Sequence, residues 1–213
     1  MLKSAEAKKL IGAKGVGGDR LTLKLRDEDE ILINEISKVN DNIVVVYIGG
    51  SAIDMSSWES NVPSIIFSWY SGMEGGNALA KIIYGDVNPS GKLPLTIASS
   101  VGQLKMFYNH KHSMYYRDYA IYNNRPLYYF GFGLSYTKFE ISEPKLKSLA
   151  FTKDKLRVSV DIKNVGEISG DEIVQLYISD KYSSITRPIK ELKAFKRVSL
   201  KSGESKEITF ELG

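Results

Sequence analysis

The sequence predicts an α/β domain with a mostly parallel sheet, followed by an all-β sandwich. Two continuously apolar, β-branched runs, 43–50 and 64–70, are each bounded by glycine or polar residues, and a helical pattern follows them. Such runs are typical of strands buried on both faces of a parallel sheet. From residue 156 onward, apolar and polar residues alternate, which is the period of antiparallel strands with one solvated face. The pattern therefore changes from α/β to all-β along the chain.

Composition and charge narrow the functional classes. The chain has 213 residues, of which 43% are hydrophobic and 25% charged, as in ordinary globular proteins. Its net charge is +4, and both signs are interleaved: 15 basic against 12 acidic residues from Thr137 onward, and 14 against 13 before it. A nucleic-acid-binding protein concentrates its basic residues on one face. We therefore expect a solvated surface and no nucleic-acid partner.

No segment predicts a membrane span, a leader or a metal centre. No apolar run approaches the roughly 20 residues of a spanning helix, and residues 1–9 lack the apolar core of a signal peptide. There is no cysteine, which excludes disulfides and thiolate metal sites. The only histidines, His110 and His112, fall short of the three protein ligands that zinc normally takes. We expect a cytoplasmic protein, unless an upstream segment carries a signal, with no membrane contact, metal or cofactor.

Two helices are expected in the first part. The first begins at the acidic run Asp27–Glu30, because the helix dipole favours negative charge at its N-terminus. A pair of catalytic carboxylates is the alternative interpretation of this run, and we prefer capping. The helix carries apolar residues at helical spacing: Ile31, Leu32, Ile36 and Val39. The second helix covers residues 75–84 and ends at Gly85.

The second part of the chain reads as a series of antiparallel strands. The first of these places Leu156, Val158, Val160 and Ile162 on one face. Three further strands are expected within 171–180, 190–200 and 205–212. We place the domain boundary just after Tyr136, which gives domains of residues 1–136 and 137–213.

The glycine-rich stretch 13–20, AKGVGGDR, raises the question of a phosphate-binding loop. A dinucleotide fingerprint needs a third glycine at the position of Arg20, and the P-loop needs Gly-Lys followed by Ser or Thr. Neither requirement is met, and the preceding residues do not read as a strand. From these residues alone, a flexible turn is the default interpretation.

Four stretches resemble a known enzyme family. Residues 69–97, 100–111 and 125–140 closely resemble signatures of family 3 glycoside hydrolases, of the β-glucosidase and β-xylosidase type. Residues 171–200 resemble the fibronectin type III-like module that ends many of these enzymes. The resemblance implies an α/β sandwich domain followed by a fibronectin type III-like sandwich. It also implies that the N-terminal catalytic barrel is absent, that the first domain is truncated at its N-terminus and that the second is truncated at its C-terminus.

The same resemblance bears on catalysis. The family carries its nucleophilic aspartate on the barrel, and many members carry the acid/base glutamate in a motif like G-E-G-x-D-R, which aligns with Gly15–Arg20 and places Val16 at the glutamate. Retaining cleavage uses two carboxyl groups, one as nucleophile and one as proton donor, and valine cannot donate a proton. We expect the C-terminal portion of a β-glucosidase- or β-xylosidase-like hydrolase that has no catalytic residue of its own and is inactive alone.

Three residues are candidates for substrate binding. Asp19 and Arg20 could contact sugar hydroxyls or form a structural ion pair, and we favour the ion pair. Glu74 stands at the start of the second predicted helix, where a carboxylate is stabilised by the dipole in any case. The expected ligand is an oligosaccharide or aryl glycoside, bound when a catalytic barrel complements the chain.

Two other interpretations stay open. Residues 107–136 carry eight of the 13 tyrosines, which could stack on sugar rings or pack a seam between the domains. Stacking would suit a non-catalytic carbohydrate-binding or adaptor module, and we favour packing. A truncated sheet would expose unpaired edges, so self-association or a partner chain is also expected.

Overall fold

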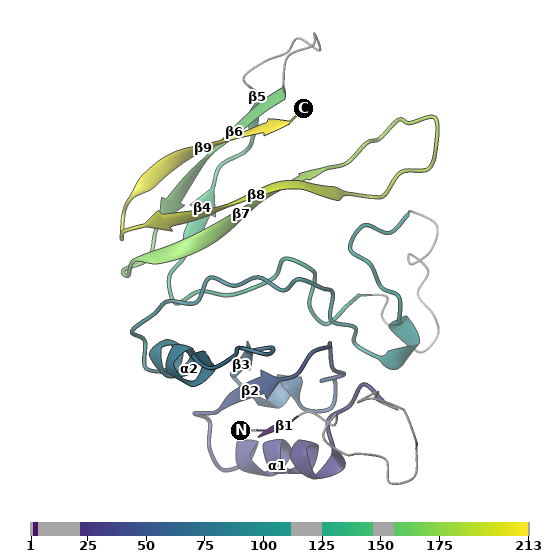
Figure 1. Ribbon diagram of the computed structural model, residues 1–213, viewed down its shortest axis with the longest axis vertical. Helices are drawn as coiled ribbons and strands as arrows, with labels where there is room; N and C mark the ends of the chain where they lie inside the picture. Colours follow the sequence, from purple (N-terminus) through teal and green to yellow (C-terminus); the bar gives the residue numbers. More distant parts are fainter. Residues whose placement is uncertain (1, 4–21, 112–124, 147–155, 213) are drawn as a thin grey trace. The chain divides into compact units, whose positions relative to one another are not determined.

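The computed structural model describes residues 2–3, 22–111, 125–146 and 156–212 (Figure 1). The chain divides into two compact units. The first unit comprises Met1–Ala80, Leu95–Phe107 and Arg117–Phe130, and the second comprises Lys81–Pro94, Tyr108–Tyr116 and Gly131–Gly213. The glycine-rich stretch with Val16, Asp19 and Arg20 lies outside the described residues, as do His112 and the tyrosines at 115, 116, 119 and 122.

The first unit is built on a parallel sheet in the order β1-β2-β3. The strands are β1 (Leu2–Lys3), β2 (Val44–Ile48) and β3 (Ser64–Phe67). Both apolar runs therefore form neighbouring parallel strands, as predicted. The prediction that both faces of β2 are buried is wrong. One face carries the buried Val45 and Tyr47, while the other is only partly covered. Tyr47 is held by an edge-to-face contact with Phe67, with ring centroids 5.2 Å apart.

Helix α1 (Asp27–Ser37) confirms that the acidic run begins a helix. The Arg26 side chain donates two hydrogen bonds of 2.8 Å to the Asp29 carboxylate, which closes the first turn. The buried face of α1 carries Asp29, Glu30 and Ile33. The four apolar residues at helical spacing are 39% to 85% exposed instead, because Ile33 and the two paired carboxylates occupy the face turned toward the unit.

Helix α2 (Gly75–Ile83) ends as expected. Gly85 adopts a φ of 84°, and its N–H donates to the carbonyl of Ile82 at 3.1 Å. A left-handed residue after the last turn is the usual helix stop, and glycine adopts it without strain. The unit also contains two short 3-10 helices, η2 (Glu59–Asn61) and η3 (Val101–Gln103). Its most deeply buried side chains include those of Ile53, Met55, Trp58 and Ile97.

The second unit contains an antiparallel β-sandwich (Figure 1). One sheet joins β4 (Phe139–Ile141), β5 (Lys145–Leu146), β6 (Leu156–Asn164) and β9 (Ser205–Leu212), and the other joins β7 (Gly170–Ile178) to β8 (Glu191–Leu200). The four longer strands confirm the sequence pattern. Their inward side chains form one core: Val160, Ile162, Val174, Val198, Leu200, Ile208 and Phe210.

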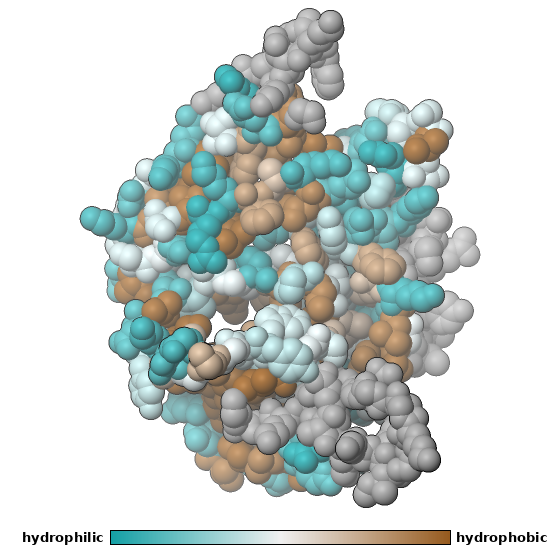
Figure 2. All heavy atoms as spheres, viewed as in Figure 1, coloured by the Kyte–Doolittle hydropathy of each residue, from teal (hydrophilic) through white to brown (hydrophobic). Residues whose placement is uncertain are grey.

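Hydrophobic side chains also reach the surface. Figure 2 shows brown hydrophobic groups scattered among hydrophilic ones over the visible face. Single exposed apolar residues are normal in soluble proteins, so this distribution by itself indicates no partner. Within the described part of the chain, no helix is both long enough and apolar enough to cross a bilayer.

Candidate functional site

Glu74 occupies the turn that starts α2. Its carbonyl accepts the N–H of Ala78 at 2.9 Å, and its exposed carboxylate accepts a 2.7 Å hydrogen bond from the Asn77 side chain. The carboxylate thus lies at the positive end of the helix dipole, where negative charge is stabilised. It is also open to solvent, so it can accept a hydrogen bond from a ligand hydroxyl.

The loop that carries Glu74 follows the carboxyl end of β3, the edge at which open α/β sheets bind ligands. Trp69 adopts a φ of 50°, which is unusual for a bulky residue. Its ring lies against Phe67, with centroids 5.4 Å apart. Tyr70 lies over Gly50, where a Cβ would approach the tyrosine ring to 2.7 Å. The loop therefore holds a defined shape at the sheet edge through aromatic contacts.

Three buried carboxylates in the first unit have structural partners. Asp29 pairs with Arg26, Glu30 accepts a 2.8 Å hydrogen bond from the Ser57 hydroxyl, and Asp54 accepts the N–H and hydroxyl of Ser56 at 3.1 and 2.6 Å. Sequence reasoning did not single out Asp54. These bonds orient the carboxylates toward the protein rather than toward a ligand.

Tyr128 and Glu59 form a hydrogen-bonded pair in the first unit. The Tyr128 hydroxyl donates to Glu59 Oε1. Burial of the phenol, and then its hydrogen bond to Glu59, raise the pKa of Tyr128 well above its ordinary value. Tyr128 is therefore a neutral hydrogen-bond donor at physiological pH and cannot act as a base.

A shallow polar depression lies beside α1. Its volume is about 460 Å³, and it is lined by Asn34, Ser37, Lys38, Ser57 and Asn61. The Asn61 amide donates to Asn34 Oδ1 at 2.9 Å. The lining contains no carboxylate and no aromatic ring, so this depression offers neither the carboxyl groups of glycoside cleavage nor a stacking surface for a sugar.

The tyrosines of the described residues mostly contact protein. In the second unit, the rings of Tyr108 and Tyr177 meet edge to face with centroids 6.0 Å apart, and the Tyr136 hydroxyl donates to the carbonyl of Ile82 at 2.8 Å. Packing within a unit thus accounts for several tyrosines of the tyrosine-rich segment 107–136. Tyr182 is different, because it is 93% exposed.

Metal ligands do not gather in the described part of the chain. No three His, Asp or Glu side chains there are placed to share an ion. His110 is instead engaged locally, with Nδ1 lying 3.1 Å from the carbonyl oxygen of Lys111.

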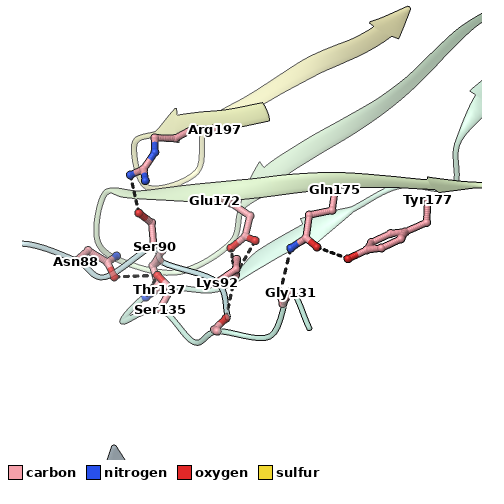
Figure 3. Close-up of polar contacts among 11 residues, drawn as sticks. Asn88, Ser90, Lys92, Gly131, Ser135, Thr137, Glu172, Gln175, Tyr177 and Arg197 are labelled. Atoms are coloured by element: carbon pink, nitrogen blue, oxygen red, sulfur yellow. Dashed lines mark hydrogen bonds and ion pairs between the residues drawn. The ribbon is translucent and has the colours of Figure 1, made fainter. Parts of the chain in front are cut away.

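The second unit contains a dense polar network (Figure 3). We call it the clamp: the contacts between segments 88–92 and 131–137 and the strands β7 and β8. Lys92 Nζ lies 2.8 Å from Glu172 Oε1 and donates to the carbonyl of Gly133 at 2.8 Å. Gln175 Nε2 donates to the carbonyl of Gly131 at 3.0 Å. The clamp positions the backbone rather than any group open for chemistry.

Asn88 and Arg197 complete the clamp. Asn88 Oδ1 accepts from the Ser135 hydroxyl and from the Tyr136 N–H, both at 2.8 Å, while its amide donates to the carbonyl of Ser169 at 3.1 Å. Arg197 donates to the Ser90 hydroxyl at 2.7 Å. Sequence reasoning placed Arg197 in a predicted strand and did not predict the network.

Comparison of the sequence with profiles of known protein families decides the family. The profile of the glycosyl hydrolase family 3 C-terminal domain matches residues 3–136, which is more than half of the chain. The chain belongs to glycosyl hydrolase family 3. The profile of the fibronectin type III-like domain matches residues 172–213. The predicted fold class, an α/β sandwich domain followed by a fibronectin type III-like sandwich, is thereby confirmed.

Relatives within family 3 are β-xylosidases and β-glucosidases. A β-xylosidase from Formosa agariphila is 40% identical over 93% of this chain and 28% of its own length. A β-glucosidase from Bacteroides ovatus is 40% identical over 91% of this chain and 28% of its own length. A solved β-glucosidase from Erythrobacter marinus superposes with a TM-score of 0.92 at 39% identity, covering all of this chain and 28% of that one. The chain thus spans little more than a quarter of the length of these relatives.

Proposed function

We propose that this family 3 chain serves as the C-terminal part of a β-glucosidase- or β-xylosidase-type glycoside hydrolase and hydrolyses no glycoside by itself. The observation that carries the proposal is the 40% identity to a β-xylosidase over 93% of this chain but only 28% of the relative. Sequence identity over nearly all of this chain supports a role shared with that part of the relative. The greater length of the relative supports a need for further domains in catalysis.

The chemistry of the described residues supports the same conclusion. Retaining cleavage needs two carboxyl groups about 5–5.5 Å apart around the glycosidic bond. The buried carboxylates Asp29, Glu30 and Asp54 are each committed to a structural hydrogen bond. The family resemblance assigns the nucleophile to the barrel and puts Val16 at the proton donor. Loss of a general acid typically lowers a rate by ~10²–10⁴.

Three residues are proposed to contact substrate in a complemented enzyme. They are Asp19, Arg20 and Glu74, and the ligand is an oligosaccharide or an aryl glycoside. Support for Glu74 comes from its exposed carboxylate in the loop after β3. Asp19 and Arg20 are proposed from the sequence, where an ion pair between them is the preferred role and contact with sugar hydroxyls is the alternative.

Complementation tests this role. The chain is mixed with the barrel domain of one of its β-glucosidase relatives, and release of 4-nitrophenol from the β-glucoside and the β-xyloside is followed. We expect hydrolysis that rises with chain concentration and saturates. An absence of any gain, with chain and barrel shown to be folded, overturns the proposal. A Glu74→Gln variant should raise KM in this mixture, whereas Glu28→Gln on the exposed side of α1 serves as the matched control.

A second candidate function is a non-catalytic carbohydrate-binding or adaptor module. The exposed ring of Tyr182 favours it, since an open aromatic face can stack on a pyranose. Calorimetric titration with oligosaccharides decides: binding that Tyr182→Ala abolishes supports this function, and no binding at millimolar sugar excludes it.

We also propose that the chain self-associates and that it lies in the cytoplasm. Strand β3 has a single neighbour within the described part of the sheet, and open edges tend to pair. Light scattering should show dimers or larger species, and a monodisperse monomer at high concentration would contradict this.

The absence of cysteine suits the cytoplasm, although a relative from Salmonella typhimurium is named a periplasmic β-glucosidase. Cell fractionation tests the cytoplasmic location.

A further inference from the structure

Two extended segments of the second unit pair with each other. Leu93 donates its N–H to the carbonyl of Phe132 at 2.7 Å, and Gly131 donates back to the carbonyl of Leu93 at 2.8 Å. We call residues 88–94 and 131–137 the brace. The brace is thus a hydrogen-bonded pair of segments rather than two independent loops.

The brace has two distinct faces. Along 131–137, Phe132, Leu134 and Tyr136 are 41%, 75% and 50% exposed, and the residues between them are half-buried. The half-buried positions are glycine, serine or threonine. Gly131 and Thr137 bond to Gln175 and Asn164 of the sandwich, whereas Gly133 and Ser135 bond to Lys92 and Asn88 within the brace. This alternation of period two shows that one face of the brace is committed to the sandwich.

Glycines allow the close approach. A Cβ on Gly133 would collide with the carbonyl oxygen of Gly91, and one on Gly170 would lie 2.5 Å from Asn88 Nδ2. A Cβ on Gly166 would collide with the Thr137 hydroxyl. The approach at Gly133 joins the two segments of the brace, and those at Gly166 and Gly170 join the brace to the sandwich.

Asn164 joins the brace to the core of the sandwich. Its Oδ1 accepts from the Thr137 hydroxyl at 2.8 Å, and its amide donates to the carbonyls of Ile168 and Leu200 at 2.8 and 3.2 Å. Asn164 is fully buried, and its neighbour along the inward face, Ile162, is part of the core. If the brace opened alone, Oδ1 of Asn164 would lose one of its partners and the Lys92–Glu172 pair would be broken.

We propose that the brace folds and unfolds with the β-sandwich as one cooperative unit. The folding boundary then lies inside the segment matched by the family 3 C-terminal domain, which ends at residue 136, rather than at the end of that segment. The division of the chain into compact units supports this, because it groups Lys81–Pro94 with the sandwich. The proposal is independent of any glycosidase activity.

Native-state hydrogen exchange tests the coupling in the full chain. The amides of Leu93 and Gly131 report on the brace, those of β6 and β9 report on the sandwich, and that of Ile97 in the first unit is the control. Ile208→Val removes one core methyl group, which should lower protection by roughly 2- to 10-fold. We expect the same factor in the brace and the sandwich and no change at Ile97. Unchanged brace protection would overturn the proposal.

The reciprocal experiment perturbs the brace and monitors the sandwich. Gly133→Ala forces the collision with Gly91, whereas Gly91→Ala places its Cβ in open space and is the matched control. We expect Gly133→Ala to lower protection in β6 and β9 at least 10-fold, since overpacking at a closed contact is destabilising, and Gly91→Ala to change it less than 3-fold. A loss confined to the brace amides would contradict a single cooperative unit.

Discussion

Lys92 Nζ and the Glu172 carboxylate form an ion pair that is almost removed from solvent, their side chains being 13% and 14% exposed. The lysine comes from segment 88–92 of the clamp, and the glutamate comes from β7, 80 residues later in the sequence. A charge pair this buried is sensitive to loss of either partner, because the remaining charge is left without compensation.

Lys92→Met should therefore destabilise the second unit by about 2–4 kcal/mol. The variant removes the ammonium that also satisfies the carbonyl of Gly133 and leaves the Glu172 carboxylate in a poorly solvated position. Urea unfolding followed by circular dichroism measures the loss. Lys145→Met is the matched control, because the side chains of Lys145 and its partner Asp161 are 64% and 52% exposed. Exposed ion pairs contribute only about 0–1 kcal/mol to stability. Equal effects of the two variants would refute the importance of the clamp pair.

Asn164→Asp should destabilise the sandwich by about 2–4 kcal/mol. The shape is kept, but a carboxylate cannot donate to the carbonyls of Ile168 and Leu200, and these acceptors would face a buried negative charge. Thermal unfolding at neutral pH measures the effect. A recovery of stability at acidic pH, where the carboxyl is protonated and can donate once, is also expected, and an unchanged melting temperature at neutral pH would contradict this account.

Tyr128 should contribute to an alkaline loss of stability. Its pKa is raised in the folded chain by burial and by Glu59, so the unfolded chain releases this proton first. The stabilisation is complete below about pH 10, the ordinary tyrosine pKa, and is lost as the pH rises from there toward the folded value. The urea midpoint should therefore fall more steeply above pH 10 in the native chain than in Tyr128→Phe.

Tyr182→Phe is the control for this pH effect. Its ring is 93% exposed, so the substitution removes a phenol hydroxyl that lies in solvent rather than in the protein interior. The urea midpoint is followed between pH 9 and 11 for the native chain and for both variants. An equal dependence on pH in all three would contradict the raised pKa of Tyr128.

Local periodicity explains what could be predicted of the fold. The β-branched runs of β2 and β3 and the alternation in β6 repeat over several residues and identify strands. Strands β1, β4 and β5 have only two or three residues, too few for a period to show. The burial of Glu30 on α1 could not be predicted because its partner, Ser57, lies 27 residues away in sequence.

The candidate site, too, could be predicted only where local sequence carries the signal. Glu74 could be placed at a helix start from the glycines and the apolar pattern that follow it. The clamp could not be predicted, because Lys92 and Glu172 each read as ordinary surface charges. One signal was available: the alternation that places Val160 and Ile162 on the inward face places Asn164 there too, and a polar residue at a core position must be hydrogen-bonded.

Hydrolysis by the chain alone tests the central claim most directly. The purified chain is incubated at high concentration with 4-nitrophenyl β-glucoside and β-xyloside, and the rate is compared with buffer and with heat-denatured chain. We predict no release of 4-nitrophenol above the buffer rate, because the resemblance assigns the nucleophile to the barrel domain and aligns Val16 with the proton donor of many members. Saturable release that disappears on denaturation, and that a carboxylate substitution such as Glu74→Gln removes, would contradict it.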